Sequence, residues 1–256
     1  MSHLIQRTIN HIHTIKLNRP DVRNAFNDDM ITEMTKAFKD VNKNSEARVM
    51  VIKGEGESFC AGGDLNWMKS MVDYSEKENI KDSEKLYEMY EALAQVEVPV
   101  ITLVHGHAMG GALGLIAASD IVYAVEETQF CFSEVRLGLA PAVISAFVKD
   151  KIHPRDMHRF FLTAEVFDSA DAYDMGLIHG YGDMDEVAEQ VSKTAIKLTK
   201  NGPKALKATK KLINEIKTTN NIKKVTTELI ASLRVGDEGQ EGLKAFFEKR
   251  KPNWLE

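Results

Sequence analysis

Short apolar runs alternate along the first half of the chain with longer stretches in which apolar residues recur every three or four positions. The runs indicate buried strands, and the longer stretches indicate amphipathic helices. After a hairpin that alternates over 4–8 and 11–17 around Asn10, the expected strands cover 49–52, 100–104 and 121–125. The expected helices run from an Asn27 cap to about Val41, over 75–95 and over 111–118. This order predicts an α/β fold with parallel strands and right-handed crossovers.

The pattern of the second half is almost wholly helical. Helices are expected over 141–149, 155–162, 169–175, 185–198, 203–217, 222–235 and 237–249. The sequence Asn201-Gly202-Pro203 interrupts this series, because glycine and proline together favour a break. We therefore expect a core of residues 1–198, followed by a helical C-terminal region of residues 199–256.

Composition narrows the class of protein. The chain has 256 residues, 43% of them hydrophobic and 28% charged, which allows one sizeable core. A net charge of −5 argues against nonspecific binding to nucleic acid or anionic membranes. The longest small or apolar run, 108–118, is too short to cross a bilayer, and the N-terminus lacks a signal pattern, so we expect a cytoplasmic protein. Cys60 and Cys131 lack metal-ligand spacing and are expected to be small buried residues.

Two glycine turns follow buried strands. One is Ala61-Gly62-Gly63-Asp64, and the other is Met109-Gly110-Gly111, which opens a helix of small residues. Backbone N–H groups at such a turn can bind an anion, or an oxygen that becomes anionic during a reaction. Because α/β proteins bind ligands where strands end, the two turns together could form a two-donor oxyanion site. The alternative is that the glycines only allow tight turns.

Glu134 is the candidate general base. A lone glutamate is ordinarily a solvated surface residue, but apolar neighbours in 130–137 can desolvate this one and raise its pKa. The nearby Arg136 could oppose that shift or bind substrate. His105 and His107 flank Gly106 close to the suspected site, and a packing role is the alternative for His107. No third ligand stands at a metal-binding spacing, so no metal is expected. The common nucleophile-elbow, phosphate-loop and dinucleotide fingerprints are also missing from the sequence.

Four stretches, in order, resemble the enoyl-CoA hydratase/isomerase (crotonase) superfamily along nearly the whole chain. They are Leu17–Pro20 with Asn24–Phe26, Phe59–Leu65, His105–Ala112 and Ser133–Leu139. The resemblance implies a spiral of ββα units with a helical C-terminal region that packs homotrimers, often paired into hexamers. It implies an acyl-CoA substrate and no metal or redox cofactor.

The resemblance also assigns roles to residues. The thioester carbonyl would sit between the backbone N–H groups of Gly63 and Gly111. Coenzyme A would lie near Arg23, Ala61, Asp64 and Leu65, and the adenine near Phe246 and Lys249 on the last helix. Core packing is the alternative for Phe246.

One position departs from the two-glutamate pattern of common hydratases. This chain has Gly114 where the first glutamate is expected and Glu134 at the second. A single later glutamate resembles enoyl-CoA isomerases and bacterial methylglutaconyl-CoA hydratases of leucine and isoprenoid breakdown. The segments 64–69, 114–115 and 141–145 are most like the hydratases of that group.

The hypothesis from sequence is syn-type hydration of an enoyl-CoA, either 3-methylglutaconyl-CoA or a related branched thioester. Lys69 or Arg136 could pair with the distal carboxylate of such a substrate. The alternatives are an enoyl-CoA isomerase that uses Glu134 alone, a decarboxylase, and a non-catalytic acyl-CoA-binding relative.

Overall fold

The main sheet of the computed structural model, which describes residues 2–255, has six strands in the order β1-β2-β3-β4-β6-β8. Their bounds are Leu4–Ile9, Ile12–Leu17, Val49–Gly54, Val100–Val104, Ile121–Val125 and Gly180–Gly182. Strands β1 and β2 are antiparallel, and every later pairing in this sheet is parallel. The predicted hairpin is confirmed: Asn10 and His11 have φ of 48° and 66°, which suits a two-residue turn between twisted strands.

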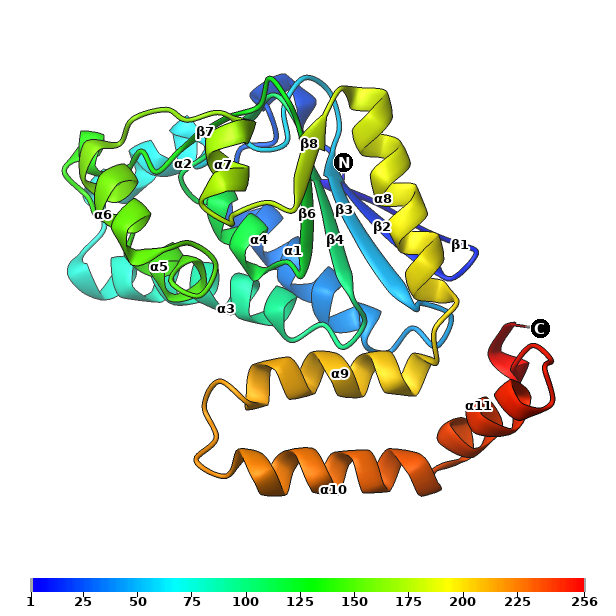
Figure 1. Cartoon of the computed structure of the whole chain (residues 1–256). Coiled ribbons are helices and arrows are strands. Elements are labelled where there is room, and N and C mark those ends of the chain that lie inside the picture. Colours follow the sequence, from blue (N-terminus) through cyan, green and yellow to red (C-terminus); the bar gives the residue numbers. More distant parts are fainter. Residues whose placement is uncertain (1, 256) are drawn as a thin grey trace.

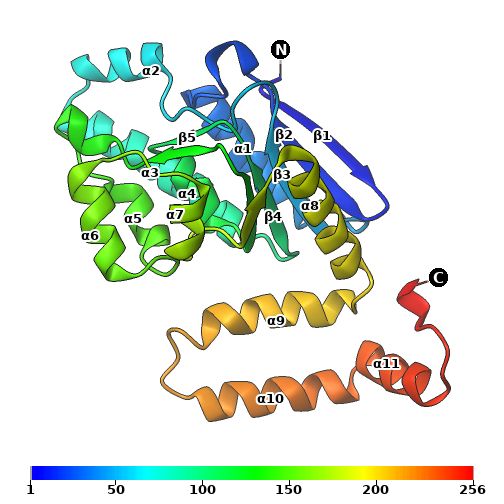
Figure 2. The ribbon, with the colours of Figure 1, turned by 45° about the horizontal axis from the view of Figure 1, so that its top comes forward.

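Helices cover both faces of the sheet (Figures 1 and 2). The helices of the core are α1 Asp28–Val41, α2 Leu65–Ser70, α3 Glu76–Ala94, α4 Ala112–Ala118, α5 Ala142–Val148, α6 Pro154–Thr163, α7 Ser169–Asp174 and α8 Met184–Thr199. Successive side chains of β3 point to opposite faces. Met50 and Ile52 therefore join the main core with α1, α3 and α4, whereas Val49 and Val51 pack with α8. This arrangement confirms the α/β prediction.

Local sequence signals explain where the long helices begin. The side chain of Asn27 accepts a hydrogen bond from the N–H of Met30 at 2.9 Å, as predicted for the cap of α1. Ser75 and Glu78 form a capping box at the start of α3. Helix α4 consists wholly of buried residues, so it packs closely on its neighbours. Helix α4 packs against α3 on one side and α5 on another.

Several short elements of the structure differ from what the sequence pattern predicts. Residues 107–109, expected within a turn, form strand β5 (His107–Met109), which pairs in parallel with β7 (Gln129–Cys131) in a second, two-stranded sheet. Strand β8 and helix α2 were also not expected. The expectation that strands end after 125 is wrong at β7 and at β8, where Gly180 and Gly182 give no apolar pattern. Three residues are too few to show an alternation of apolar and polar positions.

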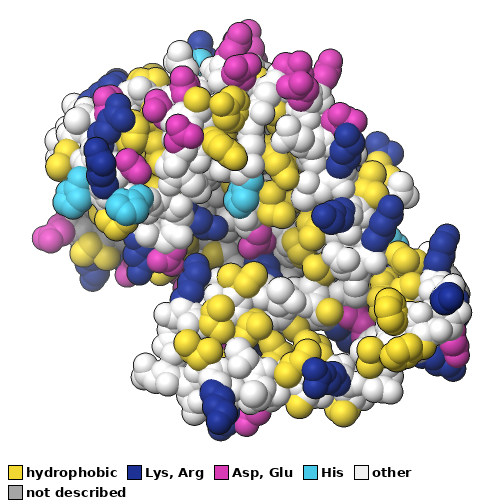
Figure 3. Space-filling view, in the orientation of Figure 1, with side chains coloured by type: hydrophobic (Ala, Val, Ile, Leu, Met, Phe, Trp, Pro, Cys, Tyr) yellow, Lys and Arg dark blue, Asp and Glu magenta, His cyan; other side chains and the backbone are white. Residues whose placement is uncertain are grey.

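The last three helices extend away from the core (Figure 1). They are α9 Pro203–Glu215, α10 Ile222–Val235 and α11 Asp237–Phe247. Lys210 of α9 ties this part to the core, because its Nζ lies 2.6 Å from Asp120 and donates to the carbonyl of Val98. Apolar side chains gather over these helices in Figure 3. The exposed large apolar residues of the three helices include Ile213, Ile222, Ile230, Val235, Leu243, Phe246 and Phe247. The division at residues 198 and 199 remains a prediction.

Candidate active site

A ladder of three parallel segments brings the glycine turns and the Glu134 loop together. The N–H of Cys60 donates to His107 at 3.0 Å, and the N–H of Met109 donates back to Cys60 at 3.1 Å. On the other side of β5, the N–H of Gly110 donates to Cys131 at 2.8 Å. The segments before Gly63, Gly111 and Glu134 are therefore neighbours, and the expectation that the two turns share one edge is confirmed.

Close contacts make the glycines necessary. Gly62 has φ of 93°, and a Cβ there would lie 2.9 Å from the carbonyl oxygen of Met109. Phe26 touches both turns: it is bridged to Gly63, and its ring would lie 3.1 Å from a Cβ on Gly111. Within residues 2–255 no hydrogen-bond acceptor faces the N–H of Gly63 or Gly111. Two preorganised backbone donors are thus available to a ligand.

Glu134 begins the short 3₁₀ helix Glu134–Leu137, just beyond β7. Its Oε1 would lie 3.4 Å from a Cβ on Gly110, so the carboxylate sits beside the second turn. Its Oε2 is buried and has no hydrogen-bond partner among the described residues. Burial raises the pKa of this carboxyl, although its own backbone N–H partly opposes the shift. A desolvated carboxylate with a free oxygen suits a general base.

Tyr90 is a site residue that the sequence interpretation missed, because its position in α3 predicts only an apolar core side chain. The residue is fully buried, and its hydroxyl donates to the carbonyl of Gly111 at 2.7 Å. Its ring covers Gly114, where an added Cβ would lie 2.5 Å from the Cζ of Tyr90 and 2.9 Å from Ile144. A glutamate side chain therefore has no room at position 114 while Tyr90 keeps this position.

Asp64, predicted to lie near coenzyme A, already has partners in the protein. Its Oδ2 accepts from the Arg19 guanidinium at 2.8 Å, and its Oδ1 caps α2 through the N–H groups of Asn66 and Trp67. Burial raises the pKa of this carboxyl, but hydrogen bonds from Arg19 and the α2 backbone outweigh burial and hold it below its usual value. Asp64 thereby fixes the backbone next to Gly63.

Three other predicted coenzyme A residues lie around this turn. The carbonyl of Arg23 accepts from the N–H of Ala61 at 2.9 Å, and the side chain of Arg23 is exposed. Leu65, the first residue of α2, is 82% exposed. These positions form a rim around the Gly63 turn.

Phe246 and Lys249 are not brought to the Gly63 turn in this protomer. Helix α11 and helix α2 lie on opposite sides of the molecule in both ribbon views (Figures 1 and 2). Lys249 also lies beyond the end of α11 with φ of 54°, so the two residues do not share a helix. Phe246 is 76% exposed, and the core-packing alternative is therefore wrong within this chain.

The remaining candidates have mainly structural contacts. His107 is in hydrogen-bond contact with the Ser58 hydroxyl at 3.0 Å. Arg136 donates to the carbonyl of Ala164, and Lys69 is exposed on α2. Both cysteines are buried, as predicted, and burial raises the pKa of Cys60 to about 12.

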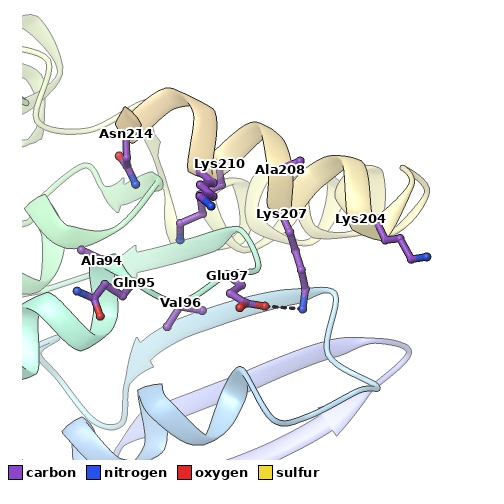
Figure 4. A pocket seen from close by; sticks show the side chains of 10 residues that line it. Ala94, Gln95, Val96, Glu97, Lys204, Lys207, Ala208, Lys210 and Asn214 are labelled. Atoms are coloured by element: carbon purple, nitrogen blue, oxygen red, sulfur yellow. Dashed lines mark hydrogen bonds and ion pairs between the residues drawn. The ribbon is translucent and has the colours of Figure 1, made fainter. Parts of the chain in front are cut away.

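No group of three metal-ligating side chains occurs among residues 2–255, and no helix there is long and apolar enough to cross a membrane. A cavity of about 550 Å³ lies between the end of α3 and α9 (Figure 4). Lys204, Lys207, Lys210 and Lys211 line it, and Lys207 pairs with Glu97 at 2.8 Å. None of the predicted site residues borders this cavity, so it is separate from the Glu134 site.

Several known proteins resemble this chain in structure or in sequence. A crystal structure of an enoyl-CoA hydratase from Shewanella pealeana superposes with a TM-score of 0.95 at 38% identity, covering 99% of this chain and 96% of the other. A crotonyl-CoA hydratase of Syntrophomonas wolfei is 30% identical over 93% of this chain and 92% of its own length. A trans-2-decenoyl-[acyl-carrier-protein] isomerase of Streptococcus mutans is 25% identical over 96% and 95%.

These likenesses confirm the predicted fold, with its helical C-terminal region. The "Enoyl-CoA hydratase/isomerase" family matches residues 7–256, which is nearly the whole chain. The chain therefore belongs to the enoyl-CoA hydratase/isomerase family.

Proposed function

We propose that this chain hydrates an enoyl-CoA thioester, with Glu134 as its only catalytic carboxylate. The observation that carries the proposal is the buried, unpartnered oxygen of Glu134 beside the turn that presents the free N–H of Gly111. A base and an oxyanion site are thus adjacent.

The reaction follows from these two groups. The N–H groups of Gly63 and Gly111 hold the thioester oxygen, which becomes negative as the enolate forms; losing one such donor typically costs about 3–4 kcal/mol. Glu134 accepts a proton from water as the water oxygen attacks the β carbon. The same carboxyl then returns that proton to the α carbon, which collapses the enolate and restores the carboxylate. Both new bonds form on the face that Glu134 occupies, so addition is syn.

For the acyl group we propose 3-methylglutaconyl-CoA or a related branched thioester. A site with one carboxylate repels an acidic acyl chain less than a site with two. Of the two cations considered for the substrate carboxylate, Arg136 is engaged with Ala164, whereas Lys69 has no ion-pair partner among the described residues. Lys69 is therefore the better candidate.

Coenzyme A would bind along the rim formed by Arg23, Ala61 and Leu65, with Asp64 shaping the turn. Phe246 and Lys249 would reach the adenine of a neighbouring subunit, which accords with the exposed apolar side chains of α9–α11. We therefore propose a homotrimer, or a hexamer of two trimers.

A second candidate is an enoyl-CoA isomerase, in which Glu134 moves one proton between carbons. Tyr90 favours it specifically, because its ring excludes a second acid at Gly114 and one carboxylate suffices for a proton shuttle. The retained Glu134 argues against a non-catalytic acyl-CoA-binding relative.

Purified protein should be assayed with 3-methylglutaconyl-CoA, crotonyl-CoA and a 3-enoyl-CoA, with products identified by mass spectrometry. Hydration is expected, with kcat/KM at least about tenfold higher for the acidic thioester, since a charge-assisted contact contributes roughly 1.5–3 kcal/mol. Glu134→Gln should lose about 10²–10⁴ in rate. The exposed Glu127→Gln is the matched control. Isomerisation without hydration would favour the second candidate, and a fully active Glu134→Gln would refute both.

A further inference from the structure

Tyr90 makes a hydrogen bond that no apolar core residue can supply. Its hydroxyl, carried on α3, donates to the carbonyl of Gly111 at 2.7 Å. Gly111 is the residue immediately before α4, and its N–H faces no acceptor in the described structure. The bond therefore links a long helix of the core to a residue whose N–H remains free for a ligand.

The Gly110-Gly111 turn has few other restraints. Both residues lack a side chain, and Gly110 has φ of 50°. Backbone bonds hold the turn through the N–H groups of Gly110, Leu113 and Gly114. Among residues 2–255, Tyr90 makes the only side-chain hydrogen bond to it. Without the hydroxyl, the carbonyl of Gly111 would keep only its bond from the N–H of Gly114, within the same turn, and would lose its hydrogen bond to α3.

The phenol itself is held in one place. Its ring covers Gly114 on one side and meets Phe147 edge-on on another, with 5.5 Å between ring centroids. Burial, with smaller contributions from Cys60 and Glu134, raises the pKa of Tyr90 well above its ordinary value. The hydroxyl consequently remains a protonated donor at neutral pH.

We propose that Tyr90 is a positioning residue of the oxyanion site, which orients the N–H of Gly111 by holding the carbonyl of the same residue. This inference rests on the proposed role of the Gly111 N–H. A donor that is misplaced by a fraction of an ångström stabilises an enolate less, while substrate binding along the rest of coenzyme A is unchanged.

The test is Tyr90→Phe, which keeps the ring and removes the hydroxyl. We expect kcat to fall about tenfold, with KM within roughly twofold of wild type. The infrared carbonyl band of bound [1-¹³C]butyryl-CoA, which cannot react, should shift less from its position in solution than it does in wild type. This band reports donor placement even if the wild-type reaction is isomerisation or if no turnover is found, so failure of the proposed function is seen separately.

Tyr87→Phe is the matched control. Tyr87 lies on the same helix and also contacts Phe147, but its hydroxyl has no partner among the described residues. It should leave both kcat and the carbonyl band unchanged. If Tyr90→Phe folds poorly, 3-fluorotyrosine at position 90 keeps the ring and gives a stronger donor, and the band should shift at least as far as in wild type. A wild-type kcat and band in Tyr90→Phe, or equal losses in Tyr87→Phe, would overturn the proposal.

Discussion

The Arg19 guanidinium lies 2.8 Å from the carboxylate of Asp64 and joins the segment after β2 to the start of α2. The two side chains are only 17% and 8% exposed, and Arg19 also donates to the carbonyl of Ala25. The pair therefore fixes the position of Asp64, the residue that follows Gly63 in the turn. A residue assigned to ligand binding by resemblance has a structural role that the sequence pattern does not reveal.

We predict that Asp64→Ala destabilises the protein by about 3 kcal/mol, because it leaves the half-buried Arg19 charge without a partner. Asp64→Asn should cost less, since the amide oxygen can still cap α2. Chemical denaturation measures both. Asp40→Ala removes an exposed ion pair with Lys43 and should leave the melting temperature unchanged. A similar melting temperature for Asp64→Ala and wild type would contradict this structural role.

Glu134→Gln should raise the melting temperature at neutral pH, although the proposed mechanism expects it to lose activity. Burial raises the pKa of Glu134 in the folded state, so the folded protein binds this proton more tightly than the unfolded chain. The stability of wild type therefore falls as pH rises through the window above 4.5, the ordinary value, and glutamine removes that loss. Thermal melts at a series of pH values should show the difference vanish below this value. A constant difference across all pH values would argue against a desolvated carboxylate.

Gly114→Ala should destabilise the protein by about 1–3 kcal/mol, because the new methyl group overlaps the ring of Tyr90. This direction is opposite to the gain of roughly 0.5–1 kcal/mol expected from helix propensity alone. At Gly236, the N-cap of α11, a Cβ meets nothing nearer than 3.4 Å, so Gly236→Ala loses only the N-cap preference and should cost about 0.5–1 kcal/mol. Equal stabilities of the two variants would show that Tyr90 moves aside easily.

Phe246→Ala should weaken coenzyme A binding about tenfold only in the assembled oligomer, if its ring stacks on adenine across the subunit interface. Isothermal titration calorimetry with coenzyme A measures this affinity at protein concentrations above and below the range in which the oligomer dissociates. Phe247→Ala is the matched control, since both rings are 76% exposed in the protomer. An equal loss of affinity in separated protomers would place the adenine contact within one chain.

The sequence pattern predicted the long elements well, because β1–β4, β6 and the helices other than α2 have enough residues to show a periodicity. The three-residue strands β5, β7 and β8 form through pairing with distant segments, and that information is not local. The site residues also divide into those that local sequence indicates and those that it does not. Gly63, Gly111 and Glu134 lie in or beside turns, and their residue types indicate a backbone donor site and a base. Tyr90 has the spacing of any core residue, and only the packing of α3 against α4 brings its hydroxyl to Gly111.

The ladder of Cys60, Ala108 and Phe130 has a consequence for how substrate preference changes among relatives. The two proposed donors and the proposed base each follow one of these paired residues within four positions. Main-chain hydrogen bonds therefore set the spacing of the reacting groups, and peptide geometry is the same for every sequence. Side chains on α2 and α5 lie outside the ladder and are free to diverge, whereas Tyr90 on α3 contacts it at Gly111. The spacing of the three proposed reacting groups is thus independent of those side chains, and we expect substitutions on α2 and α5 to change substrate preference without moving these groups.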